Sequence, residues 1–367
     1  MYTNQSNPKN QKYYMGLALF YANKALGNTK KNPAVGCVVI KNGTMISAGH
    51  TSVNGRPHAE FNALNKKKIS YKDSELYVTL EPCSHYGLTP PCINSIIKKK
   101  IKKVYFSIKD FDKRSFNKSS KLLKKNGIAV KSGILNRKVN SFYRSYKKNK
   151  EEDFPFLTFK LAISKDFYSI NKKKKWITNY FSRGRVHLLR SYHDAILTSS
   201  STVNIDNPKL NCRIEGLNKK SPVRIVLDKN LKTNISSVIY NNQKKQKTIV
   251  FYNTIDKKKI YKFKNKGVKV YKILIDKKGN LNLRAVLKKI KKLGFCRVFL
   301  ECGVNLGISF IKEGLIDDFK LFVSNKKLGS LGRGSTKKLF KSFLMGKKKE
   351  IEKVNLFGEK LLTYKLQ

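Results

Sequence analysis

One histidine and two cysteines in the first quarter of the chain form a pattern typical of a zinc site. Glu60 lies two residues after His58, and Cys83 and Cys92 each follow a proline. One imidazole and two thiolates can hold zinc with the fourth tetrahedral position open. Glu60 is not needed as a ligand and is placed to move protons to and from a water at the metal. The pattern therefore requires a fold that brings separate segments together, and it is typical of enzymes that hydrolyse amines on heterocyclic bases.

The segments around this pattern alternate between helical and strand signals. Apolar residues at helical spacing predict a helix over 14–25, and the apolar run 35–40 predicts a buried strand. Asn42-Gly43 predicts a tight turn into a second strand. Further strands are expected at 76–80 and 104–108, with helices before them. This order predicts an α/β domain in which helices cover a sheet.

Two helices are expected to begin at the metal ligands. His58 follows Pro57 at the start of one helix, and Thr89 is expected to cap the next, with Pro90 and Pro91 in its first turn. Helix N-termini favour a thiolate over a thiol. The predicted helix starts therefore suit metal binding by cysteine.

A charged stretch without apolar periodicity at 146–153 predicts a linker or domain edge. We therefore expect two domains, at 1–147 and 154–367. In the second half, short apolar runs alternate with helical patterns, which predicts another α/β domain. The candidate strands are 156–163, 195–197, 223–227, 248–251, 268–273, 297–300 and 319–323.

The formal net charge of +56 raises the question of nucleic-acid binding. Lysines occur along the whole chain, as at 66–68, 172–175 and 347–349, and asparagine and isoleucine are also common. This breadth is typical of drift toward AT-rich codons, whereas a functional patch is confined to one face or segment. We predict no specific nucleic-acid partner.

The cysteine and apolar patterns indicate a cytoplasmic protein. The 6 cysteines do not resemble a disulfide framework in a chain of this size, and a reducing compartment fits them best. No apolar run is long enough to span a membrane, and the first residues lack the apolar core of a signal peptide. We predict no membrane partner, and the sequence is compatible with a homo-oligomer.

The thiol spacing points to one family. A long insertion separates Cys83 from Cys92, whereas two residues separate the cysteines of common nucleobase deaminases. With this insertion, the chain resembles the bifunctional deaminase/reductase family of riboflavin biosynthesis. The matching segments are Asn32-Pro33-Ala34-Val35-Gly36-Cys37-Val38, Pro57-His58-Ala59-Glu60, and Thr79-Leu80-Glu81-Pro82-Cys83-Ser84-His85 through Thr89-Pro90-Pro91-Cys92.

The resemblance implies a cytidine-deaminase-like α/β/α domain that removes ammonia from a 2,5-diaminopyrimidinone ribosyl phosphate. It implies zinc on His58, Cys83 and Cys92, with Glu60 as the catalytic acid and base. Asn32 and His85 are candidate substrate contacts. The structural alternatives are a turn asparagine before a proline for Asn32 and a solvent-exposed loop histidine for His85.

The resemblance continues through the second half, in segments such as Phe159-Lys160-Leu161-Ala162, Asp206-Asn207-Pro208 and Glu301-Cys302-Gly303. It implies a dihydrofolate-reductase-like domain that reduces the ribosyl group with NADPH. The implied cofactor contacts are Ala162, Trp176, Thr202, Asp206, Gly303, Val304, Asn305, Leu306, Gly307, Ile308 and Ser309. The implied substrate contacts are Lys174, Arg190, Leu210, Arg213 and Glu301. A core position for Trp176 and a plain surface position for Arg190 are the structural alternatives.

One loop of the second half departs from the family pattern. The chain has Ser164-Lys165-Asp166-Phe167 where the family has a glycine at the last position, and Lys174 replaces a substrate-contacting serine in a shorter loop. A deaminase with a degenerate reductase domain is therefore one rival interpretation. A nucleic-acid base deaminase and a lysine-rich structural or RNA-coating protein are the others. The long insertion and the match of the second half oppose the base deaminase, and the metal pattern opposes the coating protein.

Overall fold

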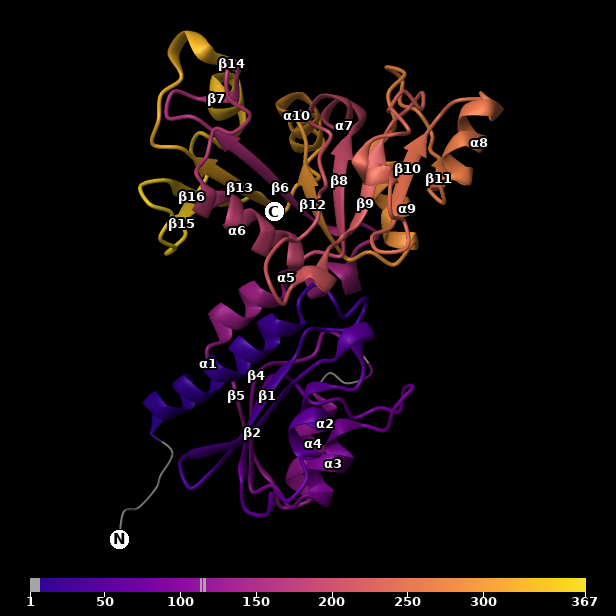
Figure 1. Cartoon of the computed structure of the whole chain (residues 1–367). Coiled ribbons are helices and arrows are strands. Elements are labelled where there is room, and N and C mark those ends of the chain that lie inside the picture. The colour runs from indigo at the N-terminus through magenta and orange to yellow at the C-terminus, as the bar shows by residue number, and fades with distance from the viewer. Residues whose placement is uncertain (1–6, 113, 115–116) are drawn as a thin grey trace. The chain divides into compact units, whose positions relative to one another are not determined.

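The computed structural model describes residues 7–112, 114 and 117–367, and the chain divides into two compact units, Met1–Glu152 and Asp153–Gln367 (Figure 1). Both units are α/β, as the alternating pattern predicts. Within the described residues, no helix is both long enough and apolar enough to cross a membrane.

The first unit is built on a five-stranded sheet with the order β2-β1-β3-β4-β5. β1 is antiparallel to β2 and β3, whereas β3, β4 and β5 are parallel. The predicted turn between β1 and β2 is confirmed, with positive φ at both Asn42 and Gly43. The strands are β1 (Gly36–Lys41), β2 (Thr44–His50), β3 (Glu75–Leu80), β4 (Lys103–Ile108) and β5 (Ala129–Ser132).

Helices cover both faces of this sheet (Figure 1). α1 and α5 lie on the face that carries Tyr77 and Thr79, and α2, α3 and α4 lie on the opposite face. Gly36 lets the backbone of α1 lie close to β1, and Gly49 lets the backbone of α2 lie close to β2. A Cβ at either glycine would clash with the backbone of the helix. The elements are α1 (Pro8–Ala25), α2 (Ala59–Leu64), α3 (Cys92–Lys98), α4 (Lys118–Lys125), α5 (Asn136–Glu151) and the short 3₁₀ turn η1 (Val53–Gly55).

The charged stretch that we expected to be a linker is mostly helical. α5 continues to Glu151, so most of the stretch is helix and not linker, whereas the boundary between the two units, after Glu152, does fall within it. Val139, Tyr143 and Tyr146 are buried at helical spacing and hold the helix against the sheet. The apolar stripe begins before the charged stretch, which is why a window over the charges alone misses it.

The second unit contains a nine-stranded sheet with the order β11-β10-β9-β8-β12-β6-β13-β16-β15. The strands from β11 to β13 are parallel, and β16 is antiparallel to both β13 and β15. β7 and β14 form a separate two-stranded sheet. The strands are β6 (Phe156–Ile163), β7 (Tyr168–Asn171), β8 (Ala195–Ser199), β9 (Val223–Leu227), β10 (Thr248–Tyr252), β11 (Lys269–Lys272), β12 (Arg297–Glu301), β13 (Asp318–Val323), β14 (Gly332–Ser335), β15 (Lys349–Ile351) and β16 (Lys360–Lys365).

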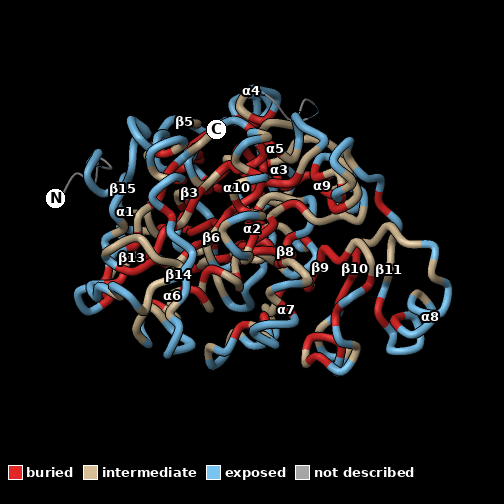
Figure 2. Tube along the Cα trace, turned by 90° about the horizontal axis from the view of Figure 1, so that it is seen from above, coloured by how far each residue is buried: buried red, intermediate tan, exposed pale blue. Residues whose placement is uncertain are grey.

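The predicted strands of the second half are confirmed with small shifts at their ends. α9 and α10 share one core cluster with the sheet, and α6, α7 and α8 pack in two clusters on the other side. Figure 2 shows buried residues along β8, β9 and β10. The helices and turns are α6 (Tyr180–Ser191), α7 (Ser200–Asp206), η2 (Asn218–Lys220), η3 (Val238–Tyr240), α8 (Lys257–Asn265), α9 (Leu283–Lys292), α10 (Val304–Lys312), η4 (Gly329–Leu331), α11 (Lys337–Leu339) and η5 (Phe340–Leu344).

Candidate active sites

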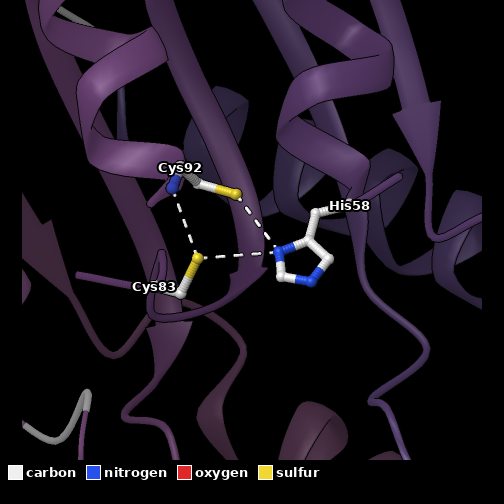
Figure 3. Close-up of side chains that lie close together, drawn as sticks. All are labelled: His58, Cys83 and Cys92. Carbon is white, nitrogen blue, oxygen red and sulfur yellow. Dashed lines mark hydrogen bonds between the residues drawn. The ribbon is translucent and has the colours of Figure 1, made fainter. Parts of the chain in front are cut away.

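The three predicted metal ligands lie together in the first unit (Figure 3). Nδ1 of His58 is 3.3 Å from Sγ of Cys92 and 3.6 Å from Sγ of Cys83. All three ligand atoms lie within 4.8 Å of one another. A zinc ion bonded at about 2.0–2.3 Å to each ligand holds the ligand atoms roughly 3.5 Å apart. The donor set and its spacing therefore fit zinc with one position left for water or substrate.

Local structure explains how these side chains converge. His58 is the N-cap residue of α2, Cys92 is the first residue of α3, and Cys83 follows the end of β3. The backbone N–H of Cys92 donates to Sγ of Cys83. α3 thus directs its positive N-terminal end toward the Cys83 thiol.

The charge state of the two thiols is set by their contact. The hydrogen bond from Cys92 lowers the pKa of Cys83 to about 4, and the hydrogen bond with His58 acts in the same direction. The same contact with Cys83 and burial raise the pKa of Cys92. The Cys83 thiol therefore ionises more readily than that of Cys92, and a bound divalent cation would favour the thiolate form of both.

Glu60 is buried in the first turn of α2, with 4% of its surface exposed. Burial, and then the charge of Cys83, raises the pKa of Glu60 to about 7. A carboxyl group with a pKa near neutrality can both accept and donate protons. The positive charge of a bound metal would favour the carboxylate form.

The two candidate substrate contacts lie on loops beside the ligand-bearing segments. Nδ2 of Asn32 donates to the backbone carbonyl of Gly55 at 3.3 Å. The backbone N–H of Asn32 donates to the Thr29 carbonyl and so closes a turn. His85 is half-buried in the loop between the two thiols. Contact of Asn32 or His85 with substrate stays a prediction.

The expected helix cap at Thr89 is wrong. α3 begins at Cys92 with Pro91 as its N-cap residue, because Pro90 and Pro91 stand before the helix and not in its first turn. The Thr89 hydroxyl instead accepts a hydrogen bond from Nη1 of Arg56. Arg56 is a neighbour of the site that the sequence reasoning missed, and its place two residues before His58 is the signal that could have found it.

In the second unit, several predicted cofactor residues lie at the carboxyl ends of adjacent parallel strands. α7 follows β8 and carries Thr202 and Asp206, and α10 follows β12 with Gly303 as its N-cap residue. Figure 1 places α7 and α10 over the same edge of the sheet. Loops and helix N-termini at this edge are where α/β sheets bind ligands.

Further predicted cofactor residues lie on β6 and in α10. Ala162 lies on β6, and the side of α10 that carries Gly307 packs on Phe159, where a Cβ would clash with the ring. Gly307 is therefore needed for core packing whether or not it contacts a cofactor. The other predicted residues, Val304, Asn305, Leu306, Ile308 and Ser309, lie in the first two turns of α10.

Trp176 is 54% exposed, which excludes the alternative that it anchors the core. Lys175 Nζ and the Arg183 guanidinium lie 5.5 and 5.2 Å from the centre of its ring. Lys175 Nζ also donates to the backbone carbonyl of Asp206 at 3.4 Å, which links this loop to α7. Lys174, the predicted substitute for a serine, is exposed.

The predicted substrate residues Arg190 and Glu301 bind each other. Nε and Nη2 of Arg190 donate to the two carboxylate oxygens of Glu301 at 2.6 and 2.9 Å, and Nη1 donates to the Asn211 carbonyl. Their side chains are only 11% and 12% exposed, which excludes a plain surface position for Arg190. Burial opposes ionisation of Glu301, but Arg190 outweighs burial and lowers the pKa of Glu301.

Three further residues complete the surroundings of this pair. Arg213 is exposed, and its Nη1 donates to Oδ1 of Asn211 at 2.9 Å. Leu210 is 3% exposed and packs in the core, so only its backbone is available to a ligand. Burial, and then the charges of Arg190 and Arg213, lowers the pKa of His187 to about 4.

Lys160 is a second residue that the sequence reasoning did not single out. It lies on β6, and burial lowers its pKa although the charge of Glu301 opposes the shift. A lysine inside an otherwise apolar strand is the signal that marks it.

The departing loop forms its turn without the family's glycine. Phe167 adopts φ +70°, and its ring packs edge-on against Phe340 with centres 5.0 Å apart. The Asp166 carboxylate accepts hydrogen bonds from the Ser164 hydroxyl at 2.6 Å and the Gly329 backbone at 2.8 Å. These contacts hold the segment before β7 against the segments on both sides of β14.

Comparison with known proteins places both units. Residues 8–108 match the family described as the cytidine and deoxycytidylate deaminase zinc-binding region, and residues 155–362 match the RibD C-terminal domain. The chain is 34% identical to riboflavin biosynthesis protein RibD of Aquifex aeolicus over 96% of this chain and 97% of the relative. It is 31% identical to RibD of Escherichia coli over 88% of this chain and 89% of the relative.

Solved structures agree with these matches over the whole chain. RibD of Acinetobacter baumannii superposes with a TM-score of 0.81 at 28% identity, covering 98% of this chain and 99% of the other. A diaminohydroxyphosphoribosylaminopyrimidine deaminase/5-amino-6-(5-phosphoribosylamino)uracil reductase of Thermotoga maritima superposes with a TM-score of 0.82 at 27% identity, with the same coverage. The predicted fold class, a cytidine-deaminase-like domain followed by a reductase domain, is confirmed.

Proposed function

Because the chain belongs to the RibD family of riboflavin biosynthesis proteins, we propose that it carries out two successive steps on one pyrimidine ribosyl phosphate. The enzyme is a bifunctional deaminase and reductase, with zinc and NADPH as its cofactors. In our proposal the first unit deaminates 2,5-diamino-6-(ribosylamino)pyrimidinone 5'-phosphate. The second unit then reduces the ribosyl group of the product to ribityl. The activity in the printed name of the Thermotoga maritima structure supports this choice of substrates.

The observation that carries the deaminase proposal is the cluster of His58, Cys83 and Cys92 with Glu60 buried beside it. Zinc, when bound to these ligands, makes a water nucleophilic at neutral pH. Glu60 accepts a proton from the attacking water and donates one to the departing amine. Its burial keeps competing water away from the carboxyl group and gives it a pKa suited to both transfers.

The reductase proposal rests on residues at the carboxyl edge of the second sheet. The N-terminal turns of α7 and α10 supply backbone N–H groups for the phosphates of the cofactor. NADPH supplies the hydride. Glu301, fixed by Arg190, presents carboxylate oxygens that can accept hydrogen bonds from ribosyl hydroxyls, while Arg213 remains exposed for an anionic group.

We further propose that the enzyme acts on its small-molecule substrate in the cytoplasm without a specific nucleic-acid partner, and that it can form a homo-oligomer. Exposed lysines occur in both units, as at 66–68 and 347–349, and are not gathered in one segment. Binding to RNA or DNA should then be independent of sequence and fall steeply with salt. Deamination of cytosine or adenine in oligonucleotides at physiological salt would contradict this proposal.

The test is to incubate the purified protein with the diaminopyrimidinone substrate, with and without NADPH. Ammonia should be released in both cases, and NADPH should be oxidised only after deamination. Supplying the deaminated product directly should remove the lag in NADPH oxidation. Ammonia release without NADPH oxidation, even with that product, would favour the rival interpretation of a degenerate reductase domain.

A further inference from the structure

Arg56 connects the two segments that deliver metal ligands to the first active site. It lies two residues before His58 in the chain, and its Nη1 donates to the hydroxyl of Thr89, three residues before Cys92. Its Nη2 lies 3.4 Å from the position that a Cβ on Gly87 would occupy. The guanidinium therefore lies against the loop between the two thiols.

The backbone that carries Arg56 is held in one conformation. Asn54 and Gly55 adopt φ values of +65° and +88°, and the backbone N–H of Ser52 donates to the Pro57 carbonyl at 3.0 Å. The Asn32 amide packs on Gly55, where a Cβ would come within 2.2 Å of Nδ2. Asn32 thus holds the turn that presents Arg56, and the guanidinium is positioned before any ligand arrives.

Most of the hydrogen-bonding capacity of Arg56 is unused. A guanidinium has five N–H donors, and the contact with Thr89 uses one. No carboxylate among the described residues forms an ion pair with Arg56, although its side chain is half-buried. The loop 84–91 contains no lysine or arginine of its own, and Leu88 at its tip is 89% exposed. Arg56 therefore supplies a positive charge beside a loop that has no lysine or arginine of its own.

We propose that Arg56 binds the 5'-phosphate of the deaminase substrate. The amine-bearing carbon must approach the metal ligands beside Glu60 and Cys92, which are 4% and 5% exposed. The phosphate at the other end of the substrate must then lie toward the exposed loop 84–91, at the place where Arg56 contacts Thr89. The planar fork of a guanidinium matches two phosphate oxygens, and this geometry favours arginine over lysine. This inference rests on the proposed deaminase function.

The inference is tested by comparing the phosphorylated substrate with its dephosphorylated nucleoside. In zinc-loaded full-length protein, Arg56→Met should raise KM for the phosphorylated substrate about tenfold or more, because one charge-assisted contact is lost. The kcat and the kinetics on the nucleoside should change less than about twofold. Arg56→Lys should recover part of the loss, and free ribose 5-phosphate should compete with substrate more weakly in Arg56→Met than in the wild type.

Two matched variants separate phosphate binding from other effects. Lys66→Met removes one exposed positive charge of the same unit, so it should leave KM unchanged. Thr89→Val removes the tether but keeps the guanidinium, so it should raise KM less than Arg56→Met does. Equal KM increases for phosphorylated and unphosphorylated substrates, loss of zinc in Arg56→Met, or equal effects of Thr89→Val and Arg56→Met would overturn the inference. A wild type that deaminates neither compound would refute the proposed function, and the inference with it.

Discussion

The two proposed active sites of this protein are built in different ways. In the first unit, the metal ligands and Glu60 come from two helix starts and one strand end within a short part of the chain, and each residue type is dictated by metal chemistry. In the second unit, Arg190 and Glu301 are 111 residues apart and satisfy each other's charges. The first site can thus be identified from residue spacing, whereas the pairing of Arg190 with Glu301 becomes visible only in the folded structure.

The largest expected effect comes from removing a metal ligand. Cys83→Ser should lose most of the zinc and essentially all deamination, because a serine hydroxyl does not ionise as a thiol does. Reduction of the deaminated product should persist, since the reductase residues lie in the other unit. The zinc content of the purified variant and separate assays of both activities check this. A variant that keeps its full zinc content would show that Cys83 is not a ligand.

Glu60→Gln sharpens the difference between ligand and proton carrier. We expect it to keep about one zinc per chain and to lose deamination by roughly 10²–10⁴-fold, the usual contribution of a positioned acid or base. The amide keeps the size of the buried side chain but cannot accept the proton. Near-normal turnover in Glu60→Gln would remove Glu60 from the mechanism and leave the zinc assignment untouched.

The Arg190–Glu301 pair should behave as a buried structural unit as well as a substrate contact. Arg190→Met leaves the Glu301 carboxylate buried without a partner, and we expect the second unit to lose about 3–5 kcal/mol of stability. Arg190→Met/Glu301→Gln should lose less than the sum of the two single variants. Trp176, the only tryptophan, lies in this unit, so its fluorescence during urea unfolding reports the second unit alone.

The contrast also appears in what the sequence could predict. Spacing and proline context predicted that His58, Cys83 and Cys92 converge, and their ligand atoms do lie close together. The apolar strands of the second sheet were visible as runs, because parallel strands are buried on both faces. β15 and β16 were missed. β15 has only 3 residues, two of them charged, and β16 is bounded by Lys360 and Lys365, and both are antiparallel strands at one end of the sheet.

Contacts between distant side chains were the hardest part to predict. The sequence placed Arg190 and Glu301 among the substrate residues through family resemblance, but gave no sign that they form a bidentate pair. It also assigned Thr89 to a helix cap, whereas its hydroxyl accepts from Arg56. Helix-cap patterns describe local backbone preference. They do not predict that a guanidinium from another segment donates a hydrogen bond to the same hydroxyl.

His187 provides a pH-dependent test of the electrostatics around the buried pair. Its pKa in the folded protein is about 4, below the value of about 6.5 in an unfolded chain. Between these values the unfolded chain binds a proton that the folded chain does not, so stability is lost as the pH falls from 6.5 to 4. Since the side chain is only half-buried, we expect about 1–2 kcal/mol after screening.

His187→Asn isolates this contribution from that of the carboxylates that titrate in the same range. Asparagine keeps a donor near the Asn211 carbonyl but cannot be charged. The difference in unfolding free energy between wild type and variant should shrink or reverse below pH 5. A difference that is constant from pH 7 to 4 would mean that folding does not change the pKa of His187.

The smallest expected effect concerns the loop that departs from the family pattern. An L-residue in the left-handed region costs about 1–2 kcal/mol, and the edge-on contact of Phe167 with Phe340 returns about 0.5–1.5 kcal/mol beyond area burial. Phe167→Gly loses the ring and the strain, whereas Phe167→Ala loses the ring and keeps the strain. We therefore expect the alanine variant to be less stable than the glycine variant by roughly 1 kcal/mol.

The order of these two variants decides whether the turn is strained. At an unstrained position glycine is the more destabilising choice, because it loses more backbone entropy on folding. A glycine variant less stable than the alanine variant in urea unfolding would therefore contradict the left-handed turn. If alanine is the less stable, Phe167 forms this turn without a glycine by packing on Phe340, which holds the start of β7 against the segment after β14.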